Sequence, residues 1–376
     1  MFLKSLNLTN FRNYSNLELD FDHRPTILVG NNAVGKSNIL EAIYLLSTTK
    51  SLRVETEDEL IKTGEEFTRV EGFISNEGDT ELLIVINRPT PEVSFRKKVL
   101  VNGISRRIAD FIGNLPGVIF YPSDINMTTG SPALRRWHLD LGLAQIDQEY
   151  KRSLTSYEQF LTARNRVLKR IREGIGRADE LDYWTKELVK QGEGVRVKRE
   201  DFFNFINSLQ TPLGNFEFEY LQSPISMERL KETNGREVAA AATLIGPHRD
   251  DFRVILNDSE GSQTSQNDRK GRDLAKFGSR GEQRTATLVF KLAQLEYMAK
   301  TLGKRPILLL DDVFSELDVS HRAHVVEIVG QQQTIIATVE LENIPKSFLD
   351  SARILRVENG TIQNTSEVVF DSSEVE

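Results

Sequence analysis

A glycine-bounded loop at residues 30–37 constrains the fold of this chain more than any other feature. The loop reads G-x-x-x-x-G-K-S, follows strand-forming residues at 26–29 and precedes apolar residues at helical spacing over 38–46. In this context, backbone N–H groups and the positive end of the helix dipole cradle phosphates. Lys36 would reach the β- and γ-phosphates, and the Ser37 hydroxyl would ligate Mg²⁺. The expected nucleoside triphosphate site comprises Gly30, Asn31, Asn32, Ala33, Val34, Gly35, Lys36 and Ser37.

The second half of a phosphate site stands near the other end of the chain. Residues 307–310 form an apolar run that leads into Asp311 and Asp312. We expect Asp311 to hold Mg²⁺ through its water shell and Asp312 to be the catalytic residue that polarises the attacking water. Lys36 and Asp311 are 275 residues apart. Small P-loop kinases and GTPases do not divide their site in this way, so a large insertion must separate the two halves.

The insertion is predicted to contain an antiparallel helical hairpin. Apolar residues recur near a heptad spacing over 154–175 and again over 181–205. Gly174 and Gly176 break the first run, and two further glycines, Gly192 and Gly194, are expected to weaken the second helix locally.

Charge is unevenly distributed along the chain. The net charge is −7, yet residues 151–200 contain thirteen Lys or Arg and eight Asp or Glu. A basic region where DNA binds and a solvated basic helix face explain this excess equally well. The candidate DNA contacts on the first hairpin helix are Arg164, Arg166, Lys169, Arg170 and Arg172.

Composition narrows the class of protein further. The chain has no cysteine, which excludes disulfides and thiolate metal sites. No apolar run approaches the roughly 20 residues that span a membrane, and the first residues are too polar for a signal peptide. A cytoplasmic protein is the default expectation. The end of the chain, from residue 367, is acidic and is expected to be disordered.

A third element, "FGSRGEQRT" at residues 277–285, is a serine-glycine turn before a helix predicted over 282–300. Free N–H groups, the helix dipole and a serine hydroxyl suit this turn to another γ-phosphate. Taken alone the turn is a weak signal, since any capped helix looks similar.

Together with "SELD" after the Asp-Asp strand, these elements resemble the heads of ATP-binding-cassette proteins. The order head half, helical hairpin, head half resembles the SMC-like branch. Within it, "LKSLNLTNFRNYSNLELDF", "FYPSDINMTTGSPALRRWHLD", "IGPHRDDF" and "SRGEQRT" resemble the RecF family over nearly the whole chain. The resemblance implies an α/β fold with a P-loop ATPase head of the ABC type, formed from both ends of the chain, and an inserted α-helical lobe. The expected parts are head residues 1–122, lobe residues 123–240, head residues 241–366 and tail residues 367–376.

The resemblance also implies a function. Such a protein binds ATP and Mg²⁺, and Ser279 and Gly281 cap the ATP of a second copy in a head-to-tail homodimer. It is an ATP-dependent DNA-binding protein of recombinational repair and replication-fork maintenance. It clamps gapped or junction DNA, hydrolyses ATP slowly with stimulation by DNA, and helps RecR- and RecO-type mediators place RecA on single strands. Arg12 and Arg53 are weaker candidates for phosphate contacts, and residues 246–251, "GPHRDD", receive no role.

The sequence departs from the cassette pattern at two places. Ala337 and Val339 stand where a threonine-rich turn is expected, which puts γ-phosphate sensing by this segment in doubt. Asp312 stands where many cassette ATPases carry Glu, and its shorter reach indicates slow hydrolysis. The alternatives are the soluble ATPase subunit of an ABC transporter, which would need a membrane partner, and a cassette-type nuclease, which would need a further carboxylate-rich metal domain.

Overall fold

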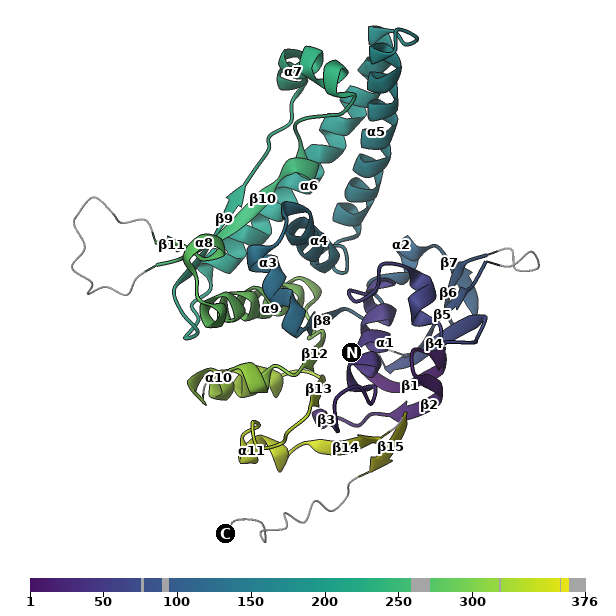
Figure 1. Ribbon diagram of the computed structural model, residues 1–376, viewed down its shortest axis with the longest axis vertical. Helices are drawn as coiled ribbons and strands as arrows, with labels where there is room; N and C mark the ends of the chain where they lie inside the picture. The colour runs from purple at the N-terminus through teal and green to yellow at the C-terminus, as the bar shows by residue number, and fades with distance from the viewer. Residues whose placement is uncertain (76–77, 90–94, 258–270, 318, 359, 365–376) are drawn as a thin grey trace, which may run out of the picture. The chain divides into compact units, whose positions relative to one another are not determined.

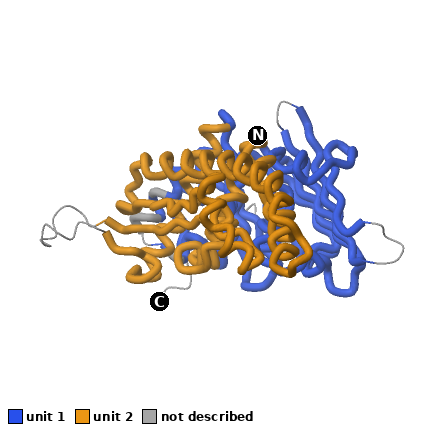
Figure 2. Tube along the Cα trace, turned by 90° about the horizontal axis from the view of Figure 1, so that it is seen from above, with its two compact units in different colours: residues 1–122, 302–376 blue, residues 123–301 orange. Residues whose placement is uncertain are grey.

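The computed structural model describes residues 1–75, 78–89, 95–257, 271–317, 319–358 and 360–364. The chain divides into two compact units, one made of residues 1–122 and 302–376 and the other of residues 123–301 (Figure 2). By compactness, residues 241–301, which were expected in the head, group with residues 123–240 in the second unit. The functional division into two head halves and an inserted lobe stays a prediction. The predicted disordered tail, 367–376, lies outside the described residues.

The first unit contains a central, mostly parallel sheet. Its strands, in spatial order, are β15 (Thr361–Asn364), β14 (Arg353–Glu358), β3 (Thr26–Val29), β13 (Thr334–Thr338), β12 (Ile307–Asp311) and β8 (Gly117–Phe120). β12 and β13 are buried along their whole length, as expected for parallel strands covered on both faces. Because β13 alone separates β3 from β12, the carboxyl ends of these two strands meet at one edge of the sheet.

A second, antiparallel sheet completes the core of this unit. Its order is β2 (Tyr14–Asp20), β1 (Phe2–Phe11), β4 (Phe67–Ser75), β5 (Asp79–Asn87), β6 (Lys97–Val101) and β7 (Ile104–Arg106). Asn102 and Gly103 both have positive φ and form the tight turn that joins β6 to β7. Helix α1 (Lys36–Thr48) contacts strands of both sheets and is therefore buried on nearly every side (Figure 1).

Short helical elements accompany the two sheets. They are η1 (Glu57–Leu60), α2 (Ile108–Phe111), η5 (Phe314–Glu316), α10 (Val319–Val329) and α11 (Lys346–Leu349).

The second unit is built on the predicted hairpin. Helices α5 (Gln148–Arg172) and α6 (Leu181–Ser208) run side by side, and both are longer than their apolar patterns indicated (Figure 1). α6 continues through both of its glycines. A Cβ on Gly192 would lie 3.2 Å from the Tyr157 ring and 3.0 Å from Ile225, so this glycine allows α6 to pack closely.

The rest of the second unit packs around the hairpin. Its elements are η2 (Pro122–Ile125), α3 (Asn126–Thr129), α4 (Pro132–Leu143), η3 (Ala178–Glu180), β9 (Phe216–Leu221), α7 (Met227–Ala240), η4 (Pro247–Arg249), β10 (Asp251–Leu256), β11 (Arg272–Asp273), α8 (Leu274–Phe277) and α9 (Arg280–Leu302). Phe290 of α9 stacks on Phe252 of β10 with ring centroids 5.3 Å apart and meets Phe202 of α6 edge to face. These aromatic contacts explain why residues 241–301 belong to the unit of the hairpin.

Among the described residues, no helix combines the length and apolar character needed to cross a bilayer.

Candidate nucleotide-binding site

The loop after β3 has the conformation that its glycines were expected to provide. Ala33 and Gly35 have φ of 65° and 113°, and α1 begins directly afterwards at Lys36. A Cβ on Gly35 would lie 2.6 Å from the Tyr14 hydroxyl, and one on Gly30 would lie 2.4 Å from the Val357 carbonyl oxygen. Both positions therefore require glycine, because a side chain would collide with these atoms. Gly35 is also required because of its positive φ.

Lys36 lies across this loop. Its Nζ donates to the carbonyl oxygens of Gly30 at 2.7 Å and Asn31 at 2.8 Å. Burial lowers the pKa of Lys36, while the carboxylates of Asp311 and Asp312 act in the opposite direction. The ammonium group is thus held over the loop, surrounded by backbone that can donate to phosphate oxygens.

Ser37 and Asp311 meet at the edge of the central sheet. The Ser37 hydroxyl donates to Asp311 Oδ1 at 2.8 Å. Burial raises the pKa of Asp311, and this hydrogen bond partly offsets that effect. A hydroxyl and a buried carboxylate side by side fit a Mg²⁺ ion, which prefers oxygen ligands and relieves the cost of a buried negative charge.

Asp312 has an unusual backbone conformation for a residue with a side chain. Its φ is 51°, its N–H donates to the Ala337 carbonyl at 2.8 Å, and its own carbonyl accepts from the Ser315 hydroxyl at 2.7 Å. Asp and Asn adopt this left-handed region more readily than longer side chains do. This conformation therefore suits Asp at this position better than a longer side chain.

Ala337, which stands where a threonine-rich turn was expected, contributes to the site through its backbone carbonyl and not through its side chain. Ala337 is a buried residue of β13, and it supplies the carbonyl that holds Asp312. The neighbouring Thr338 hydroxyl donates to the Glu340 carbonyl at 3.0 Å and is therefore used locally.

Arg12 and Arg53 both lie against the carboxylate of Glu41, which no sequence motif identifies. Glu41, on α1, is 1% exposed and accepts two hydrogen bonds from Arg12, at 2.9 and 2.7 Å. Arg53 Nη1 lies 3.8 Å from the same carboxylate. A lone acid inside the apolar run 38–46 was the signal in the sequence that could have identified it.

Ser279 and Gly281 lie in the second unit, at the start of α9. The Ser279 hydroxyl accepts from the Glu282 N–H at 3.3 Å, and the Glu282 carboxylate accepts from the Ser279 N–H at 2.7 Å. This reciprocal pair caps the helix. A Cβ on Gly281 would meet nothing within 4 Å, and the neighbouring Phe277 is 68% exposed. The turn thus presents an open backbone surface.

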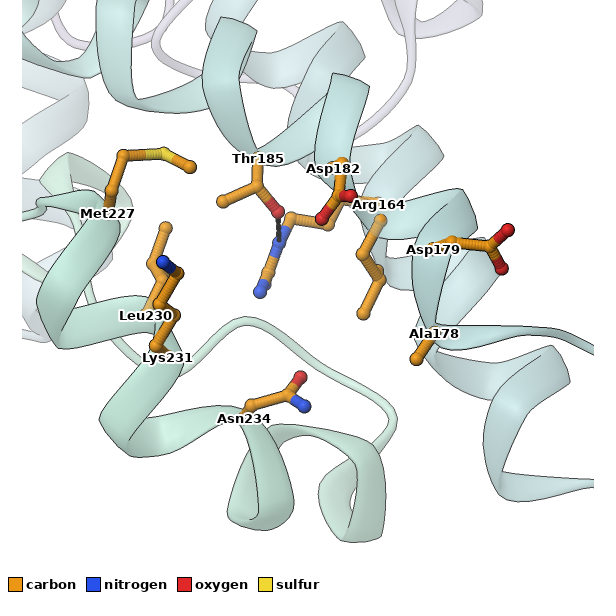
Figure 3. Close-up of a pocket in the computed structure, with 10 residues that line it drawn as sticks. Arg164, Ala178, Asp179, Asp182, Thr185, Met227, Leu230, Lys231 and Asn234 are labelled. Atoms are coloured by element: carbon orange, nitrogen blue, oxygen red, sulfur yellow. Dashed lines mark hydrogen bonds between the residues drawn. The ribbon is translucent and has the colours of Figure 1, made fainter.

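Arg164 is the one candidate DNA contact that the structure contradicts. It is 1% exposed, forms an ion pair of 2.7 Å with the buried Glu237, and donates to the hydroxyls of Thr185 and Thr243. It also lines a cavity of about 330 Å³. Figure 3 shows Arg164 beside Thr185 of α6, to which a dashed line marks its hydrogen bond. Its side chain joins helices of the lobe and offers no surface to a duplex.

The other four candidates are exposed on α5: Arg166, Lys169, Arg170 and Arg172. Arg170 forms an ion pair of 2.6 Å with Glu180 across the turn of the hairpin.

The "GPHRDD" segment, 246–251, has a structural role that the sequence did not reveal. Buried Asp250 accepts from Arg199 at 2.8 Å, from the Tyr220 hydroxyl and from the Ser223 N–H at 2.7 Å. Arg199 is itself 1% exposed, so its charge is compensated inside the unit. Sequence alone could not reveal this partner, which is 51 residues away.

His248 of the same segment is also fully engaged. Its Nδ1 accepts from the Tyr157 hydroxyl at 2.7 Å, which leaves Nε2 to donate to the Thr243 carbonyl at 3.0 Å. Burial lowers the pKa of His248. A neutral imidazole therefore ties η4 to the hairpin.

Comparison with known proteins points to one family over nearly the whole chain. A family model described as the RecF/RecN/SMC N terminal domain matches residues 2–363. Proteins named DNA replication and repair protein RecF from Bacillus cereus (strain G9842) and Bacillus thuringiensis (strain Al Hakam) are each 33% identical to this chain. Each alignment spans 388 residues and covers 96% of this chain and 98% of the relative.

Solved structures show the same likeness. A structure of the recombination mediator protein RecF with ATP, in the RecFOR pathway, is 28% identical, has a TM-score of 0.83 and covers 96% of this chain and 97% of that one. An Smc head domain from Pyrococcus furiosus, 14% identical with a TM-score of 0.52, covers 96% of this chain and 95% of its own and shares the fold. These similarities confirm the predicted fold class, and they support a repair protein and not a transporter subunit.

Proposed function

Because the chain belongs to the RecF family of DNA replication and repair proteins, we propose that it is an ATP-dependent DNA-binding protein of recombinational repair and replication-fork maintenance. The observation that carries the proposal is the hydrogen bond between Ser37 and Asp311, which joins the phosphate loop to the acidic strand. This is the pair that a Mg²⁺–triphosphate requires on its protein side. The ATP-bound structures of RecF support ATP as the nucleotide.

Within this site, each residue has a distinct task. The loop and Lys36 bind the phosphates, Ser37 and Asp311 hold Mg²⁺, and Asp312 orients water for slow hydrolysis. Mg²⁺ neutralises phosphate charge when it is bound. Asp312 is only partly exposed and is held by backbone hydrogen bonds on both sides, which supports a fixed position for its carboxylate.

We place Ser279 and Gly281 on the ATP of a second copy. The turn at the start of α9 supports this arrangement, because Ser279, Arg280 and Gly281 are exposed and open space surrounds Gly281. The Ser279 hydroxyl accepts from the Glu282 N–H but keeps its own proton to donate to a phosphate oxygen. The resulting head-to-tail homodimer is the form that closes on DNA.

The DNA surface is proposed to include the hairpin. Lysines and arginines are exposed along both helices: Arg152, Arg166, Lys169, Arg170, Arg172, Lys186 and Lys190. Pairing two chains would double this basic surface and the number of phosphates it neutralises. Gapped or junction DNA is the proposed substrate, and RecR- and RecO-type mediators are the proposed partners. In the cytoplasm, the protein would help these mediators to place RecA on single-stranded DNA.

The test is the binding of a fluorescently labelled gapped duplex, followed by anisotropy with ATP, with ADP and without nucleotide. ATP should tighten binding, and Lys36→Ala should remove the effect because it removes the only side-chain ammonium of the loop. Lys346→Ala, which alters an exposed lysine of the same unit, is the matched control. Equal affinity with and without ATP in the wild-type protein would contradict the proposed function.

A further inference from the structure

Glu41 is a buried carboxylate that collects several polar side chains beside the phosphate loop. It lies on α1, one turn after Ser37, and is 1% exposed. Arg12 binds it through two nitrogens, the Ser51 hydroxyl donates to it, and Arg53 Nη1 lies 3.8 Å away. Two guanidinium groups thus share one negative charge.

A chain of side-chain hydrogen bonds connects this cluster to the loop. Arg53 Nη1 donates to Asn38 Oδ1 at 3.1 Å, and Asn38 Nδ2 donates to Asn13 Oδ1 at 2.8 Å. Asn13 Nδ2 in turn donates to the Val34 carbonyl, inside the loop, at 3.1 Å. The position of Arg53 is therefore coupled to the position of the loop backbone.

The two arginines differ in how many of their nitrogens are used. Arg12 engages all three, since Nε and Nη2 bind Glu41 and Nη1 donates to the Glu59 carbonyl at 3.1 Å. Arg53 uses only Nη1 among the described residues, with its guanidinium 5.8 Å from the centre of the Tyr121 ring and its side chain 36% exposed. Arg12 therefore holds the Glu41 carboxylate in place, whereas Arg53 retains N–H groups that can donate to a ligand.

We propose that Glu41 is a positioning residue for nucleotide binding: without touching the nucleotide, its carboxylate holds Arg12 and Arg53 beside the loop so that Arg53 faces an anionic oxygen. The inference rests on the proposed ATP site. The physical reason is charge compensation. Without the carboxylate, two guanidinium groups would face each other, and the less restrained Arg53 would move away. A glutamine at this position would also turn an NH₂ group toward a guanidinium donor.

The test is a double-mutant cycle on ATP affinity, measured by equilibrium titration with a fluorescent ATP analogue and not by turnover. Glu41→Gln and Arg53→Ala should each weaken binding about ten-fold, the loss of roughly one charge-assisted hydrogen bond. The double variant should bind no worse than Arg53→Ala, because Glu41 acts through Arg53. Glu41→Asp keeps the charge but withdraws it by one methylene, so it should fold and still lose part of the affinity.

Glu237→Gln is the matched control, since Glu237 is a fully buried carboxylate paired with an arginine at 2.7 Å in the other unit. It should lower the thermal midpoint and leave ATP affinity unchanged. Wild-type affinity in Glu41→Asp and Glu41→Gln, or losses that multiply in the double variant, would overturn the positioning role while the ATP site stands. Failure of the wild-type chain to bind the analogue, or binding that survives Lys36→Ala, would instead overturn the proposed function.

Discussion

The Ser37 hydroxyl donates a hydrogen bond of 2.8 Å to the carboxylate of Asp311, across 274 residues of sequence. The contact exists because β3 and β12 flank β13 in a parallel sheet, so that the loop after one strand meets the acid at the end of the other. Ligands of open α/β sheets bind at this carboxyl edge. The relationship brings together the two side chains that we propose as Mg²⁺ ligands, which neither half of the chain could supply alone.

Asp311→Asn and Asp312→Asn should have different effects. Asp311→Asn removes the charge that we assign to Mg²⁺, so ATP occupancy should fall. Asp312→Asn should keep ATP binding but stop hydrolysis, because an amide cannot orient or deprotonate water as a carboxylate does. It should therefore trap the ATP-bound complex on DNA. The measurements are equilibrium ATP binding and the lifetime of the protein–DNA complex after ATP is added.

Because of the backbone conformation at Asp312, a change in stability should not complicate the comparison of the two variants. Asn tolerates the left-handed conformation as well as Asp does, so Asp312→Asn should leave the thermal midpoint nearly unchanged. If the two variants lose ATP affinity equally, the assigned division of roles between the aspartates is wrong.

Neutralising four of the exposed arginines and lysines of α5 should reduce the salt dependence of DNA binding. The variant replaces Arg166, Lys169, Arg170 and Arg172 with glutamine. The logarithm of affinity for duplex DNA falls by about 0.9 per neutralised phosphate for each decade of salt, so the loss of each true contact flattens the slope measurably. The measurement is duplex affinity in the presence of ATP at several salt concentrations.

Arg164→Gln serves as the control within the same helix. Because Arg164 is buried against Glu237, its replacement should lower stability and leave the salt slope unchanged. An unchanged slope in the four-fold variant would exclude these four side chains from the DNA surface.

Stability should decrease as the pH is lowered through the range of histidine titration. Burial, with a smaller effect of Lys291, holds the pKa of His138 well below its ordinary value, and burial also lowers the pKa of His248. In the unfolded chain these two histidines therefore bind protons at a pH at which they remain neutral in the folded chain. The contribution of each buried, neutral histidine to the free energy of unfolding is fully present above the unfolded pKa of about 6.5. As the pH falls below this value, the free energy of unfolding decreases by up to about 1.4 kcal/mol per pH unit for each histidine.

The measurement is the free energy of unfolding from denaturant titrations between pH 7.5 and 5.5. His248→Gln should flatten the dependence, whereas His23→Gln, which alters an exposed imidazole, should not. A wild-type stability that rises on acidification through this window would contradict a neutral, buried His138.

The sequence predicted the parts of this molecule that local chemistry determines. The loop at 30–37, the Asp-Asp strand and the helical hairpin each carry a pattern of their own, so spacing and residue type were sufficient. The hairpin ran longer than its apolar pattern, because tertiary packing extends helices beyond the residues that define their buried face.

The sequence could not predict pairings between distant polar residues. Arg164 carried the same charge as its neighbours on α5, but it lies on the face that meets α7, where Glu237 binds it. The same reason prevented prediction of two other ion pairs, Arg199 with Asp250 and Arg12 with Glu41. A charge pattern along a helix gives the number of arginines, whereas the partner across the fold decides which of them remain free.

The most direct test of the central claim is the solution mass of the chain with ATP, measured by sedimentation equilibrium. The monomer has a mass of 42.7 kDa, and we expect ATP to double it. Ser279→Arg should bind ATP as a monomer with nearly wild-type affinity but fail to dimerise, because we propose that Ser279 acts on the nucleotide of the partner chain. Ser226→Arg, which alters the equivalent capping serine of α7, should dimerise normally. A wild-type mass that remains that of a monomer at saturating ATP, or a Ser279→Arg monomer that loses ATP affinity, would contradict the ATP-driven dimer.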